Sequence, residues 1–259
     1  MTINGTLQIS RSGLKSLQTN LDNTANNIAN VNTTGYQAQT THFQGLIDNA
    51  LGAEEALFTG NIDDYQTSSG SAATTTTSFA QGNLTSSAQP LDVAIQGSGF
   101  FGVQADGQLL LTRAGSFHLS DTKQLVNSQG YPVAMTTTVA NGQWPSADQI
   151  QISTNGQLTT EQNGQTVVLG QLTLYQPQNT DALQPMGDQL YQATGQTLMT
   201  SQTTPDIFGT INQFQLEDAN VDLAGSMTEL LTTQRAYALN TKAMQTTDDM
   251  WAVVNRFTD

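Results

Sequence analysis

The stretch INGTLQISRSGLKSLQTNLDNTANNIANV, residues 3–31, repeats a large apolar side chain every seven residues. The repeating positions are Leu7, Leu14, Leu21 and Ile28, and Leu17 lies on the complementary position of the same repeat. A seven-residue period keeps a narrow apolar seam on one side of a helix, which is the geometry of helices that pack lengthwise. The stretch therefore predicts a long N-terminal helix that has a helical partner.

The C-terminal segment carries the same period. Its repeating positions are Leu223, Leu230, Tyr237, Met244 and Trp251. Asp222 can cap the start of this second helix with its carboxylate, and no proline interrupts the segment after it. Because a helix with an apolar seam is poorly stable alone in water, we expect the two termini to pack together, within one chain or between chains. The seam residues of both helices are the predicted assembly contacts.

The first helix is predicted to end in an asparagine-rich turn. Asn27, Asn30 and Asn32 can bond the backbone of this turn with their amides, and Gly35 can adopt the positive φ that commonly ends a helix. We expect one short apolar helix near residues 43–57. Because residues 66–78 consist of Ser, Thr, Gly, Ala and Gln, they have little to bury, and we expect a solvated segment that orders only against a neighbour.

The middle of the chain changes to the two-residue period of β-strands. Residues 91–95 and 149–152 alternate between apolar and polar side chains. Asp-Gly or Asn-Gly pairs, which favour two-residue hairpin turns, separate such runs at residues 106–107, 155–156 and 163–164. The pattern predicts a mainly antiparallel β domain.

These patterns predict an α+β protein in four parts. Residues 1–35 form an N-terminal axial helix, residues 36–80 an extended linker or insert, and residues 81–217 the β domain. Residues 218–259 form a C-terminal axial helix that packs with residues 1–35 as a discontinuous coiled-coil domain.

The composition narrows the classes of partner. Only 11% of the 259 residues are charged, against about 25% in typical soluble domains. The net charge of −14 comes from 21 acidic and 7 basic residues, and no cluster of Lys and Arg exists. This composition argues against nucleic acid and anionic membrane as partners, since both require basic clusters. The chain has no cysteine, which excludes disulfides and thiolate metal sites.

The N-terminus lacks the pattern of a cleavable secretory signal, and no stretch reaches the roughly 20 apolar residues of a membrane span. We therefore expect no membrane insertion, and any export to use a route that does not depend on a cleaved signal.

Motifs that suggest chemistry have simpler structural explanations. Residues 97–102, GSGFFG, fit a dinucleotide-binding pattern, but a strand rather than a helix is predicted to follow them. His42 and His118 lie in different predicted elements without further ligands at metal-binding spacing. The adjacent pairs Asp63-Asp64 and Asp248-Asp249 diverge on any regular element, so they form no carboxylate dyad. We expect no enzyme activity, no cofactor and no metal site.

The remaining faces of both predicted helices hold mostly Thr, Gln, Asn and Ala. A two-helix element at a protein surface normally carries Glu and Lys there. Uncharged faces suit helices that other helices cover on several sides, so the pattern indicates an assembly.

Three motifs resemble those of the bacterial flagellar basal-body rod and hook family. The N-terminal motif is ANNIANVNTTGY at residues 25–36, and the C-terminal motif is QRAY at residues 234–237, followed by Asn240, Lys242 and Ala243. The central motif is LDVAIQGSGFF at residues 91–101, followed by TRAGSF at residues 112–117. They lie in the order and at the spacing of that family, and the chain length with the segment ending TTD at residues 246–248 is most similar to the distal rod type.

The resemblance implies a structural protein that is exported unfolded by the flagellar type III apparatus and polymerises helically at the growing tip. Its terminal helices would line a central channel, and its β domain would form the outer wall of a tube that transmits torque. The implied partners are copies of the chain itself, other rod and hook proteins, and ring (bushing) proteins of the basal body, beyond the cytoplasmic membrane.

The residues leave two alternative functions open. The first is a proximal rod or hook-type axial protein, which shares the same terminal motifs. The second, from another class, is a secreted β-domain binding module whose helices form a closed coiled-coil oligomer. An open helical polymer distinguishes the axial protein from that module.

Overall fold

The computed structural model describes residues 3–47, 69–105, 107–139, 144–162 and 164–258. The chain divides into two compact units, each built from separated segments. Unit 1 comprises Met1–Ala29, Gln39–Thr77 and Asp222–Asp259, and unit 2 comprises Asn30–Ala38 and Ser78–Val221. Helices in unit 1 and antiparallel sheets in unit 2 confirm the predicted α+β class.

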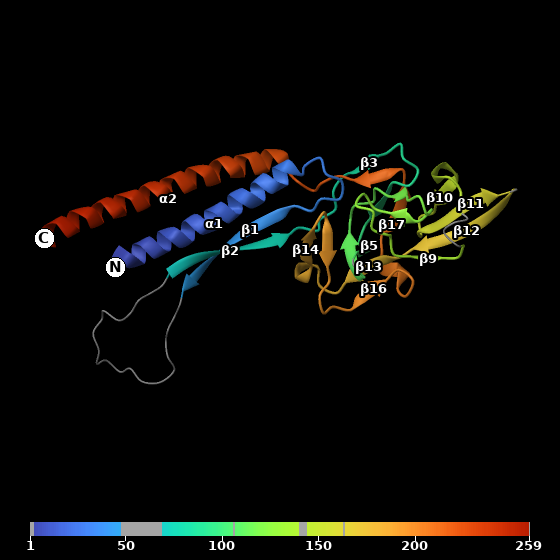
Figure 1. The fold of residues 1–259 in the computed structure, drawn as a ribbon, viewed down its shortest axis with the longest axis horizontal. Coiled ribbons are helices and arrows are strands. Elements are labelled where there is room, and N and C mark those ends of the chain that lie inside the picture. The colour runs from blue at the N-terminus through green and yellow to red at the C-terminus, as the bar shows by residue number, and fades with distance from the viewer. Residues whose placement is uncertain (1–2, 48–68, 106, 140–143, 163, 259) are drawn as a thin grey trace, which may run out of the picture. The chain divides into compact units, whose positions relative to one another are not determined.

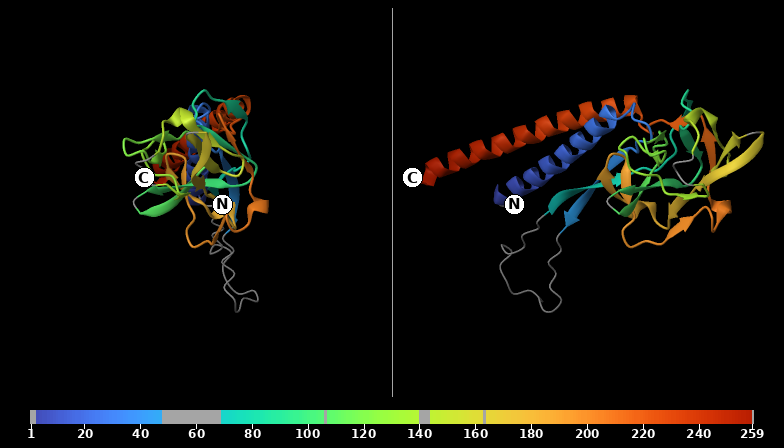
Figure 2. Two further views of the ribbon diagram at one scale, coloured as in Figure 1. Left: turned by 90° about the vertical axis from the view of Figure 1, so that its right-hand side faces the viewer. Right: turned by 45° about the vertical axis from the view of Figure 1, so that its right-hand side comes forward.

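Two long helices dominate unit 1. Helix α1 (Ile3–Ala29) packs against α2 (Leu223–Thr258), and the two run antiparallel, as Figures 1 and 2 show in blue and red. Asp222 caps α2 as expected, because its Oδ1 accepts hydrogen bonds from the N–H groups of Ala224 (3.1 Å) and Gly225 (3.2 Å). Neither helix, over its described residues, is long and apolar enough to cross a bilayer.

A β-hairpin completes unit 1 and corrects two expectations. Strand β1 (Gln39–Ile47) pairs with β2 (Ser69–Thr77), and both contact α1. The expected solvated segment at residues 66–78 is therefore wrong for residues 69–77, and the expected helix at residues 43–57 is wrong for residues 43–47. Threonine-rich sequence favours strands through its β-branched side chains, and pairing satisfies the backbone. Residues 48–68 lie outside the described part.

Unit 2 consists of antiparallel sheets. A six-stranded sheet has the order β14-β15-β6-β5-β13-β16, and a four-stranded sheet has the order β10-β11-β12-β9. The six strands are β14 (Gln184–Gly187), β15 (Leu190–Gln192), β6 (Gln108–Thr112), β5 (Phe100–Ala105), β13 (Leu174–Pro177) and β16 (Leu198–Thr200). The four are β10 (Ile150–Ile152), β11 (Gln157–Gln162), β12 (Gln165–Leu172) and β9 (Met135–Thr137).

Three two-stranded pairs complete unit 2. They are β17 (Thr210–Gln213) with β4 (Val93–Gln96), β18 (Gln215–Glu217) with β3 (Leu84–Ser86), and β7 (His118–Leu119) with β8 (Leu125–Val126). Short 3-10 turns occur at Ala147–Gln149, Thr180–Ala182 and Pro205–Ile207.

Glycine turns join the strands where the sequence predicted hairpins. Gly156 connects β10 to β11 with φ 81°, and Gly107 and Gly164 each have φ 76° at the turns after β5 and β11. Strand β5 begins at Phe100, inside the GSGFFG motif, so the helix that a dinucleotide site requires is absent at this point of the described chain. The period at residues 91–95 correctly predicted a strand, β4, although all five side chains are buried and not only every second one.

The core of unit 2 lies on both faces of β5. Phe101 belongs to the larger apolar cluster and makes an edge-on contact with Phe117. Phe100 points to a second cluster with Tyr191, and the Phe79 ring lies edge-on to both, with centroids 5.4 and 5.1 Å away. Burial raises the pKa of the Tyr191 hydroxyl, and a negative charge on Tyr36 would raise it further.

We expect the stability of unit 2 to fall as the pH rises above about 10, the ordinary pKa of tyrosine. The folded state holds the Tyr191 proton after the unfolded state has lost it, so the unfolded state binds fewer protons and the free energy of unfolding falls with pH. Urea unfolding across this range tests the expectation. The Tyr191→Phe variant should lose less stability than the parent chain, and an equal loss in both would contradict the assignment.

Candidate functional site: the terminal helices and a buried polar clasp

The most buried face of α1 is polar. Its members follow the helical spacing i, i+4, i+7, i+8 and i+11, which places them on one side. They are Ser16, Asn20, Asn23, Thr24 and Asn27, each at most 9% exposed. The leucines of the seven-residue repeat lie on a different side of the helix.

Asparagine side chains fix the pairing of α1 with α2. Asn20 Nδ2 donates to Glu229 Oε1 and Thr233 Oγ1, both at 3.1 Å. Near the other end of the pair, Asn240 Nδ2 donates to the Ser10 carbonyl at 3.3 Å. A buried polar group that loses its partner costs about 1–3 kcal/mol, so a shifted register would be disfavoured at Asn20. These bonds specify the antiparallel register.

The same face of α1 holds the hairpin. Asn23 Nδ2 donates to the hydroxyls of Thr41 and Thr75, each at 2.8 Å, and these two threonines are direct cross-strand partners. Asn27 Nδ2 donates to the Gln39 carbonyl at 2.8 Å, and its Oδ1 accepts from the Gln39 N–H at 2.9 Å. The helix therefore recognises one register of the hairpin through side-chain amides.

The predicted seam residues are not deeply buried in the single chain. Leu223 is 39% exposed. The half-buried members are Leu14, Leu17, Leu21, Ile28, Leu230, Tyr237 and Met244. The side chains of Leu7 and Trp251 lie outside the described part. The role of the seam in assembly stays a prediction.

Helix α2 also exposes apolar side chains that the seven-residue repeat did not include. These are Met227 (49% exposed), Leu231 (57%), Leu239 (69%), Met250 (55%) and Val253 (51%). Such a row of exposed apolar side chains on one element marks an interaction surface.

The turn after α1 belongs to unit 2. Asn30 accepts from the Thr33 N–H at 2.9 Å and from the Thr33 hydroxyl at 3.2 Å, whereas the Asn32 side chain is exposed. Gly35 has φ 70°, and its N–H donates to the Glu217 carbonyl at 2.7 Å. A Cβ at position 35 would collide with the backbone of Ala114. This position therefore needs glycine for both its conformation and its space.

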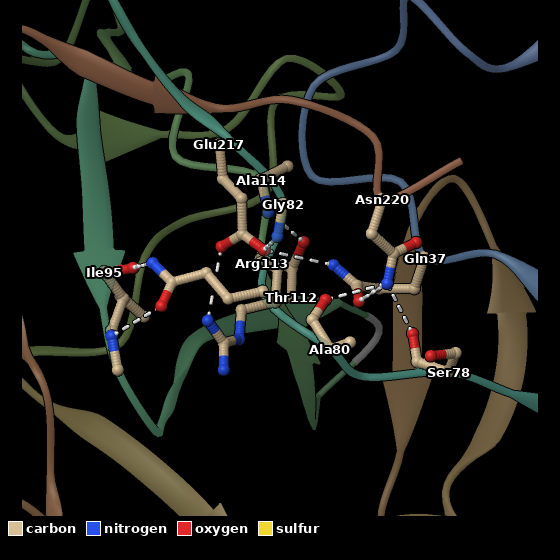
Figure 3. Close-up of polar contacts among 12 residues, drawn as sticks. Gln37, Ser78, Ala80, Gly82, Ile95, Thr112, Arg113, Ala114, Glu217 and Asn220 are labelled. Atoms are coloured by element: carbon tan, nitrogen blue, oxygen red, sulfur yellow. Dashed lines mark hydrogen bonds and ion pairs between the residues drawn. The ribbon is translucent and has the colours of Figure 1, made fainter. Parts of the chain in front are cut away.

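A network that we call the polar clasp, formed by Gln37, Arg113, Glu217 and Asn220, lies within unit 2 (Figure 3). The Glu217 carboxylate is 1% exposed. It accepts from Arg113 Nη1 at 3.2 Å, from the Gly82 N–H at 3.1 Å and from Gln37 Nε2 at 3.4 Å. One carboxylate thus joins three segments that are distant in sequence.

Asn220 extends the polar clasp to the backbone. Its Oδ1 accepts from the Ala38 N–H at 2.6 Å. Its Nδ2 lies within hydrogen-bond distance of Gln37 Oε1 (3.1 Å) and of the carbonyls of Ser78 (2.8 Å) and Ala80 (2.7 Å). The chain passes between units 1 and 2 at four places, and residues 38, 78 and 220 lie at or next to three of them. The clasp therefore joins the unit 2 side of these three crossings.

The charges of the polar clasp compensate one another. Burial lowers the pKa of Arg113, and the charge and hydrogen bond of Glu217 oppose this change. The Arg113 guanidinium also lies 5.1 Å from the centre of the Phe100 ring, within range of a cation–π contact. Arg113 Nε is buried without a hydrogen-bond partner among the described residues. The arrangement suits a structural ion pair rather than proton transfer.

The other candidates for chemistry stay apart. His42 bonds the Thr76 hydroxyl at 3.1 Å on the hairpin, and His118 is exposed on β7. Within the described ranges, no three His, Cys, Asp or Glu side chains gather as a metal site would require.

Sequence reasoning missed Asn20, Asn23, Glu217 and Asn220. Their polarity suggested solvent exposure, and their partners lie up to 213 residues away along the chain. The sequence did contain a signal for Arg113. The chain has only 7 basic residues, and an arginine next to apolar strands that becomes buried requires a charged or polar partner.

Relatives match nearly the whole chain. The flagellar basal-body rod protein FlgG of Buchnera aphidicola subsp. Acyrthosiphon pisum is 35% identical over 253 residues, which cover 94% of this chain and 96% of that protein. This chain belongs to the FlgG family of flagellar basal-body rod proteins. FlgG of Agrobacterium fabrum is 35% identical over 96% of this chain and 98% of its own length, and FlgG of Bacillus subtilis is 30% identical over 92% and 93%.

Three segments of the chain match known families of flagellar rod and hook proteins, which confirms the resemblance. Residues 7–37 match "Flagella basal body rod protein", residues 94–160 match "Flagellar hook protein FlgE/F/G D1 domain", and residues 212–257 match "Flagellar basal body rod FlgEFG protein C-terminal". Each segment contributes to the polar clasp of this FlgG-family chain: Gln37 from the first, Arg113 from the second, and Glu217 with Asn220 from the third.

We expect Glu217→Leu to lower the free energy of unfolding of unit 2 by about 3–5 kcal/mol, because it leaves the buried Arg113 charge uncompensated. Chemical denaturation of the full chain measures this loss. The exposed Asp121→Ala change is the control and should stay within about 0.5 kcal/mol. Adding Arg113→Met to Glu217→Leu should recover part of the loss, and no recovery would contradict an ion pair as the main interaction.

Proposed function

We propose that this FlgG-family chain polymerises helically into the hollow rod of the flagellar basal body, beyond the cytoplasmic membrane. The role is structural: the rod transmits torque and encloses the export channel. Subunits assemble with other rod and hook components, and ring proteins of the basal body are proposed as further neighbours. In this proposal residues 1–35 and 218–259 are the axial helices, residues 36–80 the insert and residues 81–217 the β domain.

The exposed apolar row on α2 carries the proposal. Leu231, Leu239 and Met250 are each more than half exposed in the single chain. Hydrogen bonds at Asn20 and Asn240 hold the helix pair without using these side chains. Full burial of one leucine contributes about 1.5–3 kcal/mol, so neighbouring subunits that cover the row would gain substantial binding free energy.

Threonine side chains on α2 are compatible with packing on several sides. Five of them donate their hydroxyl to a backbone carbonyl of α2 itself: Thr228, Thr232, Thr241, Thr246 and Thr247. A hydroxyl satisfied within its own helix can be covered by a neighbour without an unpaired donor. These five hydroxyls therefore leave no unpaired donor when a neighbouring subunit covers them.

We expect the double change Leu231→Ser with Leu239→Ser to raise the concentration needed for tube formation by about tenfold or more, because two exposed anchors lose their apolar surface. Electron microscopy and sedimentation of the purified full chain over a concentration series measure this. The matched control is Ile207→Ser, which removes a similarly exposed side chain, 47%, from unit 2. Closed oligomers of fixed size from the parent chain would instead favour the coiled-coil binding module.

The β1–β2 hairpin is a second proposed contact between neighbouring subunits, one that makes the tube rigid. Thr74, Thr75 and Thr76 are all exposed on β2, and Thr75 accepts a hydrogen bond from Asn23 of α1. We expect Thr74→Lys to alter the curvature or stiffness of assembled tubes with little change in monomer stability, because it adds charge only to the outer side. Tubes of unchanged persistence length in electron micrographs would count against this contact.

A further inference from the structure

Phe214 holds an unfavourable backbone conformation for its side chain. It lies between β17 and β18 with φ 61°, in the left-handed region. Four described non-glycine residues have positive φ, and the other three are Lys123, Asp188 and Gln189. A bulky residue is a genuine outlier in this region, where glycine and asparagine are the usual occupants. Phe214 is also 48% exposed, so its ring is not a core residue that would compensate for the conformation.

The surrounding structure imposes this conformation. The Phe214 N–H donates to the Asp92 carbonyl at 2.9 Å, and the Phe214 carbonyl accepts from the Ser87 N–H at 2.8 Å. On the preceding residue, Gln213 Nε2 donates to the carbonyls of Pro90 (2.6 Å) and Ile150 (2.9 Å). The backbone at position 214 is therefore fixed whatever side chain it carries. Glycine or asparagine at this position would make the monomer more stable than phenylalanine does.

The segment that bonds the Phe214 carbonyl, residues 86–89, carries no charged side chain. Ser86, Ala88 and Gln89 are exposed beside it, on the segment that bonds Phe214 through Ser87. The nearby Asp92 is buried and bonded by the Ser87 hydroxyl, and Asp218 accepts from the Thr85 hydroxyl at 3.1 Å. An exposed aromatic ring next to a segment of small, neutral, polar side chains resembles an interface anchor.

We propose that Phe214 anchors a contact between two copies of this chain. The inference rests on the proposed function, in which copies lie side by side. A chain with net charge −14 repels its own copies, so a self-contact is favoured where the surface carries few acids, and residues 86–89 beside Phe214 carry no charge. Nucleic acid and anionic membrane would instead require basic side chains, and residues 86–89 include none.

The test separates assembly from stability. In Phe214→Asn the new residue accepts the left-handed conformation and removes the ring. We expect the concentration needed for assembly of the full chain to rise about tenfold or more, while the melting temperature of unit 2 stays constant or increases. Phe214→Tyr keeps the aromatic ring and should assemble at the parent concentration. Sedimentation, electron microscopy and calorimetry provide the readouts.

Lys123→Asn is the matched control. Lys123 has φ 59° in a turn where its N–H donates to the Ser120 carbonyl at 2.9 Å, so asparagine relieves the same conformation there without removing a ring. Assembly of this variant should equal that of the parent chain.

Each outcome decides the proposal. Equal assembly of Phe214→Asn and parent chain would overturn the Phe214 contact and leave the rod function standing. A lower melting temperature with lost assembly would assign the ring to the fold and also overturn it. A parent chain that never self-associates would overturn both proposals. A closed oligomer that Phe214→Asn dissociates would support the contact while overturning the rod function.

Discussion

The burial of one carboxylate, that of Glu217, sets the conditions for the rest of unit 2. An isolated charge cannot remain in an apolar interior, so Arg113, Gln37 and the Gly82 N–H must all reach it. Meeting this requirement brings the turn after α1, the start of the β domain and the approach to α2 to one point. The arginine in turn positions its guanidinium near Phe100, at the junction with the apolar core.

The helices of unit 1 divide their surfaces between two tasks. Amides and hydroxyls form the buried contacts of α1, where direction and register must be specific, as at Asn20 and Asn23. Apolar side chains such as Leu239 remain at the surface, where non-directional burial can favour association. A helix pair built the other way, with leucines inside, would be more stable alone and would have less surface to offer. The polar interior is therefore compatible with an assembly subunit.

Local rules were sufficient for much of the fold. The seven-residue period identified both helices, Asp222 was recognisable as a cap, and the Asn155-Gly156 pair located a hairpin. The errors came from interactions between distant segments. Residues 69–77 have no apolar pattern of their own and become a strand through pairing with β1. The partners of Asn20 and Glu217 lie far along the chain, and no local period encodes such a hydrogen bond.

Unit 1 is built from three separated segments of the chain. This arrangement limits the order in which the two units can fold. Ser10 and Asn240 are bonded across 230 positions, and Asn20 and Glu229 across 209. A chain that emerges from its N-terminus therefore presents α1 while the helix that completes its polar face is still to come. Unit 2 ends at Val221, so it can close before α2 begins. Unit 1 can be completed only when residues 222–259 are available, so its association surfaces depend on the last segment to emerge.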